Sequence, residues 1–169
     1  MKKLKLLLII GLISLTACVT KPDAPQIQVG QQSISDLLNI AVAYSTECLD
    51  KYNNHPDFLL TYKEIYLQGT NPPNKIELLT SNKRLNSKQK KAFQNYIKLT
   101  SACTEGVMSR VQGSPLFGLF QRTDALLDVN ESSLLADKIT IGEANTRKLD
   151  ITQKFYGDIS SLQRQNQPR

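Results

Sequence analysis

The chain has few of the side chains on which most metal and catalytic sites depend. Its 169 residues include one histidine (His55), three cysteines and no tryptophan, and aromatic residues make up 7%. A zinc site needs three or four protein ligands, mostly histidine and cysteine, and too few remain here once the three cysteines take the lipid and disulfide roles argued below. A Ser-His-Asp or Cys-His centre would depend on His55 alone, and no glycine-rich phosphate loop is present. The sequence therefore predicts no metal, no cofactor and no enzyme activity.

The part of the chain after Cys18 has only a small excess of positive charge. Lysine and arginine number 21 against 15 aspartate and glutamate, for a formal net charge of +6. Three of the basic residues, Lys2, Lys3 and Lys5, precede Cys18, and no acidic residue does. The mild excess that remains after Cys18 does not predict a protein that binds nucleic acid.

The N-terminal apolar run is too short to cross a membrane. It covers residues 6–13, whereas a helix that spans a bilayer takes about 20 residues. The run follows Met1-Lys2-Lys3-Leu4-Lys5 and leads into Leu15-Thr16-Ala17-Cys18. A basic start, a short apolar run and small residues at a cleavage site are typical of a signal peptide, which we assign to residues 1–17.

The Leu15-Thr16-Ala17-Cys18 series resembles the lipobox of bacterial lipoproteins. The resemblance implies cleavage before Cys18, a diacylglycerol on its sulfur and an acyl chain on its amine, and several chains anchor more firmly than one. Val19 stands where many enteric-type bacteria place the aspartate that retains a lipoprotein in the inner membrane. It therefore implies lipid anchoring to the cell outer membrane, on the periplasmic face. The alternatives are the inner membrane and an ordinary secretory signal with a chance cysteine.

The rest of the chain divides into a tether, one domain and a tail. Residues 18–32 hold the lipidated cysteine and a polar tether with prolines and a glycine, which could hold a domain up to roughly 40 Å from the bilayer. In residues 33–164 apolar residues recur every three or four positions, without strand alternation or internal repeats. This pattern predicts an all-α fold, a bundle of four or five helices. Residues 165–169 are polar and are expected to be disordered.

Local patterns predict where the helices begin and end. We expect helices at about residues 33–52, 57–68, 86–113, 114–129 or 114–137, and 140–164, with a short helical turn at 75–80. Ser33 and Thr140 have the spacing of capping boxes. Pro56 suits a first helical position, and Gly69 suits a C-terminal cap. Glu143 and Arg147, four residues apart, predict an ion pair on the last helix.

The cysteine count predicts one disulfide. Lipid would occupy Cys18, which leaves Cys48 and Cys103 as a pair, and the periplasm is oxidising. Both cysteines fall on the apolar faces of expected helices, so a bridge would join these helices as a structural element. The alternative, a metal or catalytic thiol, lacks histidine or cysteine partners nearby.

Three features resemble a family of small, exported, helical proteins of proteobacteria. They are Cys48 near the end of the first helix, Cys103 in a later long helix, and the stretch Asp137-Lys138-Ile139-Thr140-Ile141-Gly142-Glu143-Ala144-Asn145 before the last helix. The resemblance covers residues 33–164 and implies a fold but no activity. A weaker likeness is to the pilotin lipoproteins of type II secretion, which also join two helices by a disulfide and begin with a glutamine-rich tether.

Two kinds of charged cluster are candidates for function. The basic run Lys83, Arg84, Lys88, Lys90 and Lys91 surrounds a helix start, where the helix dipole favours acids, so we expect Lys83, Arg84, Lys88 and Lys91 to bind an anionic partner. A solvated helix start is the alternative. The carboxylate pairs Asp124/Asp128 and Glu47/Asp50 are expected to lie on solvated helix faces. A glycosidase would need two carboxylates facing each other across a cleft.

These observations favour a non-catalytic, membrane-anchored periplasmic lipoprotein that binds another component of the cell envelope. The expected partners are the membrane, through the lipid, and an envelope protein. The alternatives are a cell-wall hydrolase or its inhibitor and a pilotin-like chaperone of a secretion system. His55, directly before Pro56, is expected to cap a helix rather than to act in catalysis, and most of the tyrosines are expected at the edges of the core.

Overall fold

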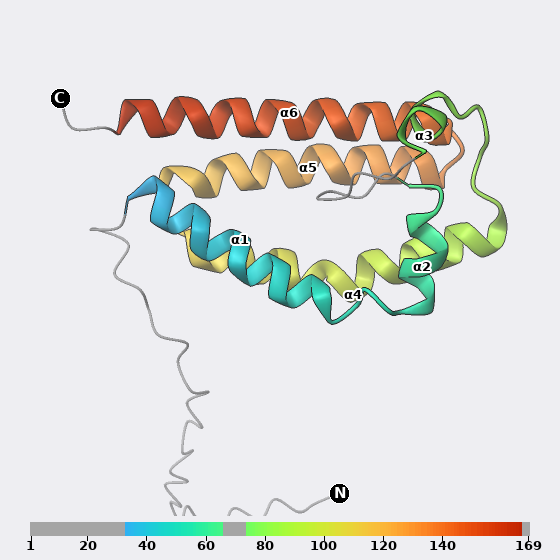
Figure 1. Cartoon of the computed structure of the whole chain (residues 1–169), viewed down its shortest axis with the longest axis horizontal. Helices are drawn as coiled ribbons and strands as arrows, with labels where there is room; N and C mark the ends of the chain where they lie inside the picture. The colour runs from blue at the N-terminus through green and yellow to red at the C-terminus, as the bar shows by residue number, and fades with distance from the viewer. Residues whose placement is uncertain (1–32, 66–73, 167–169) are drawn as a thin grey trace, which may run out of the picture.

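Six helices make up the fold in a computed structural model, which describes residues 33–65 and 74–166 (Figure 1). The segments predicted as a signal peptide and a tether lie outside the described residues, as do Cys18 and Gly69. The helices are α1 (Ile34–Asp50), α2 (Pro56–Tyr62), α3 (Lys75–Thr80), α4 (Ser87–Val111), α5 (Pro115–Leu135) and α6 (Ile141–Gln165). The described residues contain no strand, so the all-α bundle is confirmed. Two of the six helices are short, and the four long ones build the bundle.

Side-chain caps explain where the long helices start. Ser33 and Thr140 form the predicted capping boxes with Asp36 and Glu143. Asn86 forms a third with Gln89, which the sequence analysis did not identify. Each box satisfies backbone N–H groups that have no partner within the helix. His55 caps α2 as expected, because its Nδ1 accepts a hydrogen bond from the Asp57 N–H at 3.2 Å.

The second helix is shorter than predicted. It ends at Tyr62, and residues 63–65 form a turn instead of continuing a helix to residue 68. The Thr61 carbonyl accepts hydrogen bonds from both the Glu64 and the Ile65 N–H groups, at 3.1 and 2.9 Å. This tightening turns the chain so that Ile65, 4% exposed, enters the core. Burial of a branched apolar side chain here outweighs local helix propensity.

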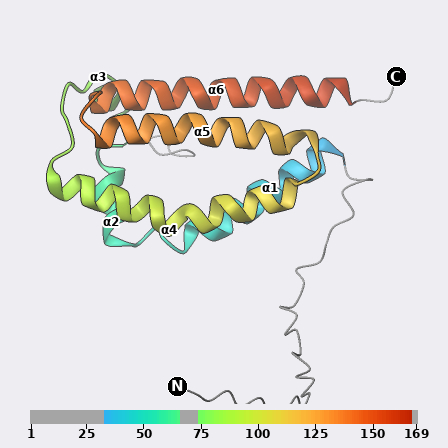
Figure 2. The ribbon, with the colours of Figure 1, turned by 180° about the vertical axis from the view of Figure 1, so that it is seen from behind.

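The helices form two layers that run side by side along the molecule (Figures 1 and 2). One layer holds α1, α2 and α4, and the other holds α5, α6 and α3. The layers meet through two separate cores. The first lies at the end where α1 begins and α6 ends, and it includes Leu37, Val111, Leu116 and Ile159. The second lies at the opposite end, and it includes Phe93, Leu134, Ile139 and Ile141.

The stretch 137–145 joins α5 to α6 at the second core. The Asp137 carbonyl accepts from the Arg84 guanidinium, and the Asp137 carboxylate pairs with Lys90. The side chain of Asn145 is fully buried, and its Nδ2 donates to the carbonyls of Glu64 and Leu78, at 3.1 and 2.9 Å. The stretch is therefore a structural joint that ties α6 to α3, α4 and the end of α2.

Candidate functional site

A cleft opens between the two layers, in the middle of the molecule and next to the first core. It has a volume of about 180 Å³, and residues of α1, α4, α5 and α6 line it. Six lining side chains are apolar (Leu49, Val107, Met108, Phe120, Leu127 and Phe155), and five carry hydroxyls (Ser45, Thr100, Thr104, Thr123 and Thr152). Among the described residues that line it, Asp124 alone is charged. A concave, mostly apolar surface with a few polar groups is the form that ligand sites usually take.

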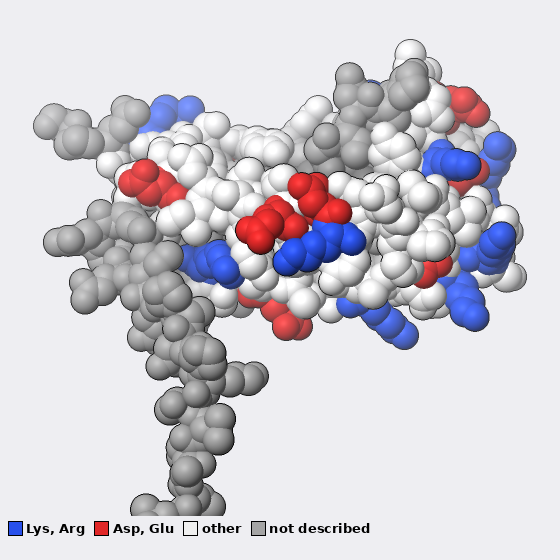
Figure 3. Space-filling model, turned by 60° about the horizontal axis from the view of Figure 1, so that its bottom comes forward, with Lys and Arg blue, Asp and Glu red and all other residues white. Residues whose placement is uncertain are grey.

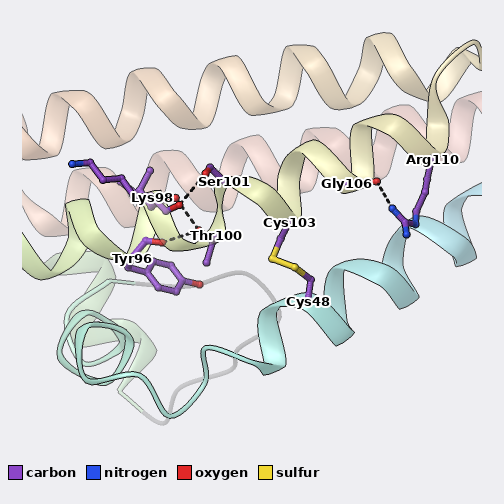
Figure 4. The surroundings of a disulfide bond; sticks show 9 residues. Cys48, Tyr96, Lys98, Thr100, Ser101, Cys103, Gly106 and Arg110 are labelled. Carbon is purple, nitrogen blue, oxygen red and sulfur yellow. Dashed lines mark hydrogen bonds between the residues drawn. A yellow bond between two sulfur atoms is a disulfide. The ribbon is translucent and has the colours of Figure 1, made fainter. Parts of the chain in front are cut away.

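The predicted disulfide forms one wall of this cleft. Cys48 on α1 and Cys103 on α4 are bridged, with their Cα atoms 5.7 Å apart, and Cys103 lines the cleft (Figure 4). Both residues are buried, at 9% and 2% exposed. Further along the same pair of helices, the Arg110 guanidinium lies 3.4 Å from the centre of the Tyr44 ring and donates to the Gly106 carbonyl at 2.8 Å. The α1–α4 layer is therefore fixed at several points along its length.

Asp124 lacks a charge partner in the part of the chain that the structure describes. No hydrogen bond or ion pair reaches its carboxylate from those residues. Burial raises the pKa of Asp124 above its ordinary value, and repulsion from Asp128, one turn along α5, raises it further. A desolvated carboxylate beside a like charge gains from a cation placed next to it. Asp124 can therefore serve as the acceptor for a cationic group of a ligand.

A group of ionisable residues lies further along the same space between the layers. Burial raises the pKa of Glu131, although attraction to Lys148 on α6 opposes the rise. Burial lowers the pKa of Lys148, and Glu131 opposes that change in turn. Tyr96 on α4 has a raised pKa, from burial and then from the Glu131 charge. Perturbed pKa values clustered beside a cleft are a common property of functional sites.

The carboxylates do not have the arrangement of a glycosidase pair. Asp124, Asp128 and Glu131 all belong to α5, and the described wall of the cleft on α4 offers Thr100 and Thr104 in place of a second carboxylate. Asp124 was expected on a solvated face, and the structure places it partly buried in the cleft wall. Asp128 is exposed, as expected.

The structure divides the basic run into two groups. Arg84 and Lys90 hold the α5–α6 joint through Asp137. Lys83, Lys88 and Lys91 are exposed and form no ion pair with a carboxylate of the described residues. Of the predicted binding residues, Arg84 therefore has a structural role and the three lysines point to solvent.

The predicted Glu143–Arg147 ion pair does not form within 4.0 Å. The Glu143 carboxylate accepts instead from the Thr140 N–H at 2.7 Å, as part of the capping box. Hydrogen bonds with the backbone and the side chain of Thr140 lower the pKa of Glu143, and the charges of Arg147 and Arg84 lower it by a smaller amount. The capping box places the carboxylate at the helix end, where it satisfies a backbone group that would otherwise lack a partner.

Residues 33–65 and 74–166 contain neither a candidate metal site nor a helix that could span a membrane. No group of three or more His, Cys, Asp or Glu side chains there could hold a metal ion. No helix in those ranges is both long and apolar enough to span a bilayer.

No protein-family model, curated protein or solved structure matches the chain.

Proposed function

We propose that this chain is a lipid-anchored, non-catalytic binding module of the bacterial cell envelope. Lipid on Cys18 holds it to the outer membrane, on the periplasmic face. The cleft between the two helical layers takes up a segment of an envelope protein that carries an apolar side chain next to a lysine or arginine. The single observation that carries this proposal is the cleft itself, with its apolar and hydroxyl lining and one carboxylate that lacks a partner among the described residues.

The lining of the cleft supports a partner segment of this composition. Apolar side chains from Met108, Phe120 and Phe155 favour a ligand that buries apolar surface, at roughly 25 cal/mol for each Å² removed from water. The hydroxyls can pair with backbone groups of the ligand, whose burial without partners would be costly. Asp124 selects for a cation at one position.

Two observations support the proposed compartment. The Cys48–Cys103 bridge joins two helices, and structural disulfides persist in oxidising compartments such as the periplasm. The lipobox-like series ends at Cys18, 15 residues before the first described residue, Ser33. A tether of that length could hold the domain up to roughly 40 Å from the bilayer, so the anchor leaves the cleft accessible to a partner.

The cleft proposal is tested with a photo-crosslinking amino acid placed in the full chain in living cells. We expect a discrete adduct with a protein when it replaces Met108, which lines the cleft, and none when it replaces the exposed neighbour Ser109. Asp124→Asn should reduce the adduct roughly tenfold, since a hydrogen bond to a charged group contributes about 1.5–3 kcal/mol. Asp150→Asn, exposed on α6, is the matched control. Equal adducts at both crosslinking positions, or none at Met108, would contradict the proposal.

The anchor is tested separately from the cleft. Metabolic labelling with a fatty-acid analogue should mark the full chain and should leave Cys18→Ala unlabelled, because the acyl chains attach to that cysteine. Cys48→Ala serves as the control, since it also removes a cysteine and should keep the label. Label that persists on Cys18→Ala would rule out lipidation at this site while leaving the cleft proposal open.

A further inference from the structure

We infer that Lys83, Lys88 and Lys91 form a second interaction surface, the distal lysine surface, which binds a carboxylate-rich segment of a protein. This surface is separate from the cleft, and its binding does not depend on the proposed function. Only the statement that it faces away from the anchoring membrane depends on the proposed lipid on Cys18.

The first argument is that the side-chain ammonium groups of these three lysines make no hydrogen bond or ion pair with residues of the described chain. Their neighbours Arg84 and Lys90 are held by Asp137, whereas Lys83, Lys88 and Lys91 are exposed and lack an ion pair there. Lys88 and Lys91 lie one turn apart on α4, so their charges repel each other. Figure 3 shows several Lys and Arg side chains gathered at this end of the molecule.

The second argument is that the lysines surround the start of α4, where the positive end of the helix dipole makes a positive charge unfavourable. The first turns of α1 and α6 contain the acids Asp36 and Glu143, but the first turn of α4 contains none. The positive end of the α4 dipole and the charges of the surrounding lysines therefore both make the electrostatic potential at the start of α4 positive. A bound carboxylate would relieve both the repulsion and the unfavourable dipole interaction.

The third argument concerns the shape of the partner. Lys83 stands at the edge of a polar hollow of about 450 Å³, which Lys63, Asn82, Glu64 and Glu77 also line. A flat anionic bilayer would meet the carboxylates of that hollow as well as the lysines. A protein segment can place its own carboxylates on the lysines and hydrogen-bond the amide and hydroxyl groups between them, so the mixed charge favours a discrete segment.

The fourth argument is position. The described chain begins at Ser33, at one end of the bundle, and α4 begins at the opposite end (Figure 1). The 25 residues of α4 span about 37 Å. The proposed anchor joins the domain at the end of the bundle opposite the distal lysine surface, so this surface can face away from the membrane that holds the lipid. Its partner therefore comes from the periplasmic side.

The test uses the full lipidated chain in nanodiscs of neutral phosphatidylcholine and a fluorescent hexaglutamate peptide as the probe. We expect saturable, salt-sensitive binding by fluorescence anisotropy, and a loss of at least tenfold in affinity for Lys83→Gln/Lys88→Gln/Lys91→Gln. The control Lys51→Gln/Lys98→Gln/Lys154→Gln removes the same charge from other exposed sites and should keep affinity within twofold. The first triple variant should be at least as stable as the native chain, because it removes repulsion.

Two outcomes would overturn the inference, and a parallel arm separates lipid from protein as the partner. Hexaglutamate could fail to bind the native chain, or the control variant could lose as much affinity as the test variant, which would make the effect one of net charge. In a parallel arm, vesicles of phosphatidylglycerol are added and separated by flotation. If the nanodiscs float with these vesicles through the three lysines while hexaglutamate does not bind, the surface recognises lipid and not an acidic protein segment.

Discussion

Gly142→Ala is expected to lower the free energy of unfolding by about 3 kcal/mol, as inserted methyl groups do in tightly packed sites. A β-carbon at this position would lie 2.6 Å from the Ser81 carbonyl oxygen, 2.7 Å from the Ser81 nitrogen and 2.8 Å from the Leu79 carbonyl oxygen. All three are backbone atoms, so no side chain can rotate away. The Gly142 N–H also donates to the Ser81 carbonyl at 2.8 Å, and the substitution would disturb that bond. Urea unfolding followed by circular dichroism measures the loss.

Gly157→Ala, in the same helix, is the matched control and should change stability in the opposite direction. Apart from its chain neighbours and the backbone of its own helix, no described heavy atom lies within 4 Å of the added β-carbon there. Alanine is better than glycine in a helix interior by about 0.8–1 kcal/mol, so a gain of that order is expected. If both variants lost stability equally, the cost at Gly142 would come from a general effect in α6 and not from its contact with the segment after α3.

Local chemistry made most of the fold predictable from the sequence. The caps at Ser33, His55 and Thr140 depend on residues within three positions of the helix start, and the structure confirms them. The bundle follows from apolar spacing, and the disulfide follows from the cysteine count. The end of α2 was mispredicted because Ile65 is drawn into a core formed with residues of α4, α5 and α6, which no local pattern reveals.

The candidate site was less predictable, because it depends on which helices face each other. Asp124 has the same spacing to Asp128 whether its helix face is solvated or covered, and only the packing of α5 beside α4 and α6 decides between the two. A usable indication was present in Glu131, a charged residue at the three- and four-residue apolar spacing of α5, since polar residues at expected core positions often mark function. The two roles within the basic run were unpredictable for a similar reason. Lys90 pairs with Asp137, which lies 47 residues away in the sequence.

The Cys48→Ala/Cys103→Ala variant is expected to lose about 4 kcal/mol of stability, the estimate for opening a loop of this length in the chain-entropy model. The bridge closes a loop across a sequence separation of 55 residues. It also joins α1 to α4 where Cys103 forms part of the cleft wall. Helical content should remain native, because both positions lie inside helices that have their own capping boxes. Urea unfolding with and without dithiothreitol measures the effect.

The reductant provides the control for this last prediction. Dithiothreitol should shift the native chain towards the stability of the double variant and should leave the variant itself unchanged. The shift should require partial unfolding, because both cysteines are buried in the native state and a thiolate is disfavoured there. Alkylation of membrane fractions under denaturing conditions offers an independent measurement, since a bridged pair reacts only after reduction. Reaction of both cysteines without reductant would mean that the bridge is absent from the protein in the cell, and the expected 4 kcal/mol would not be found.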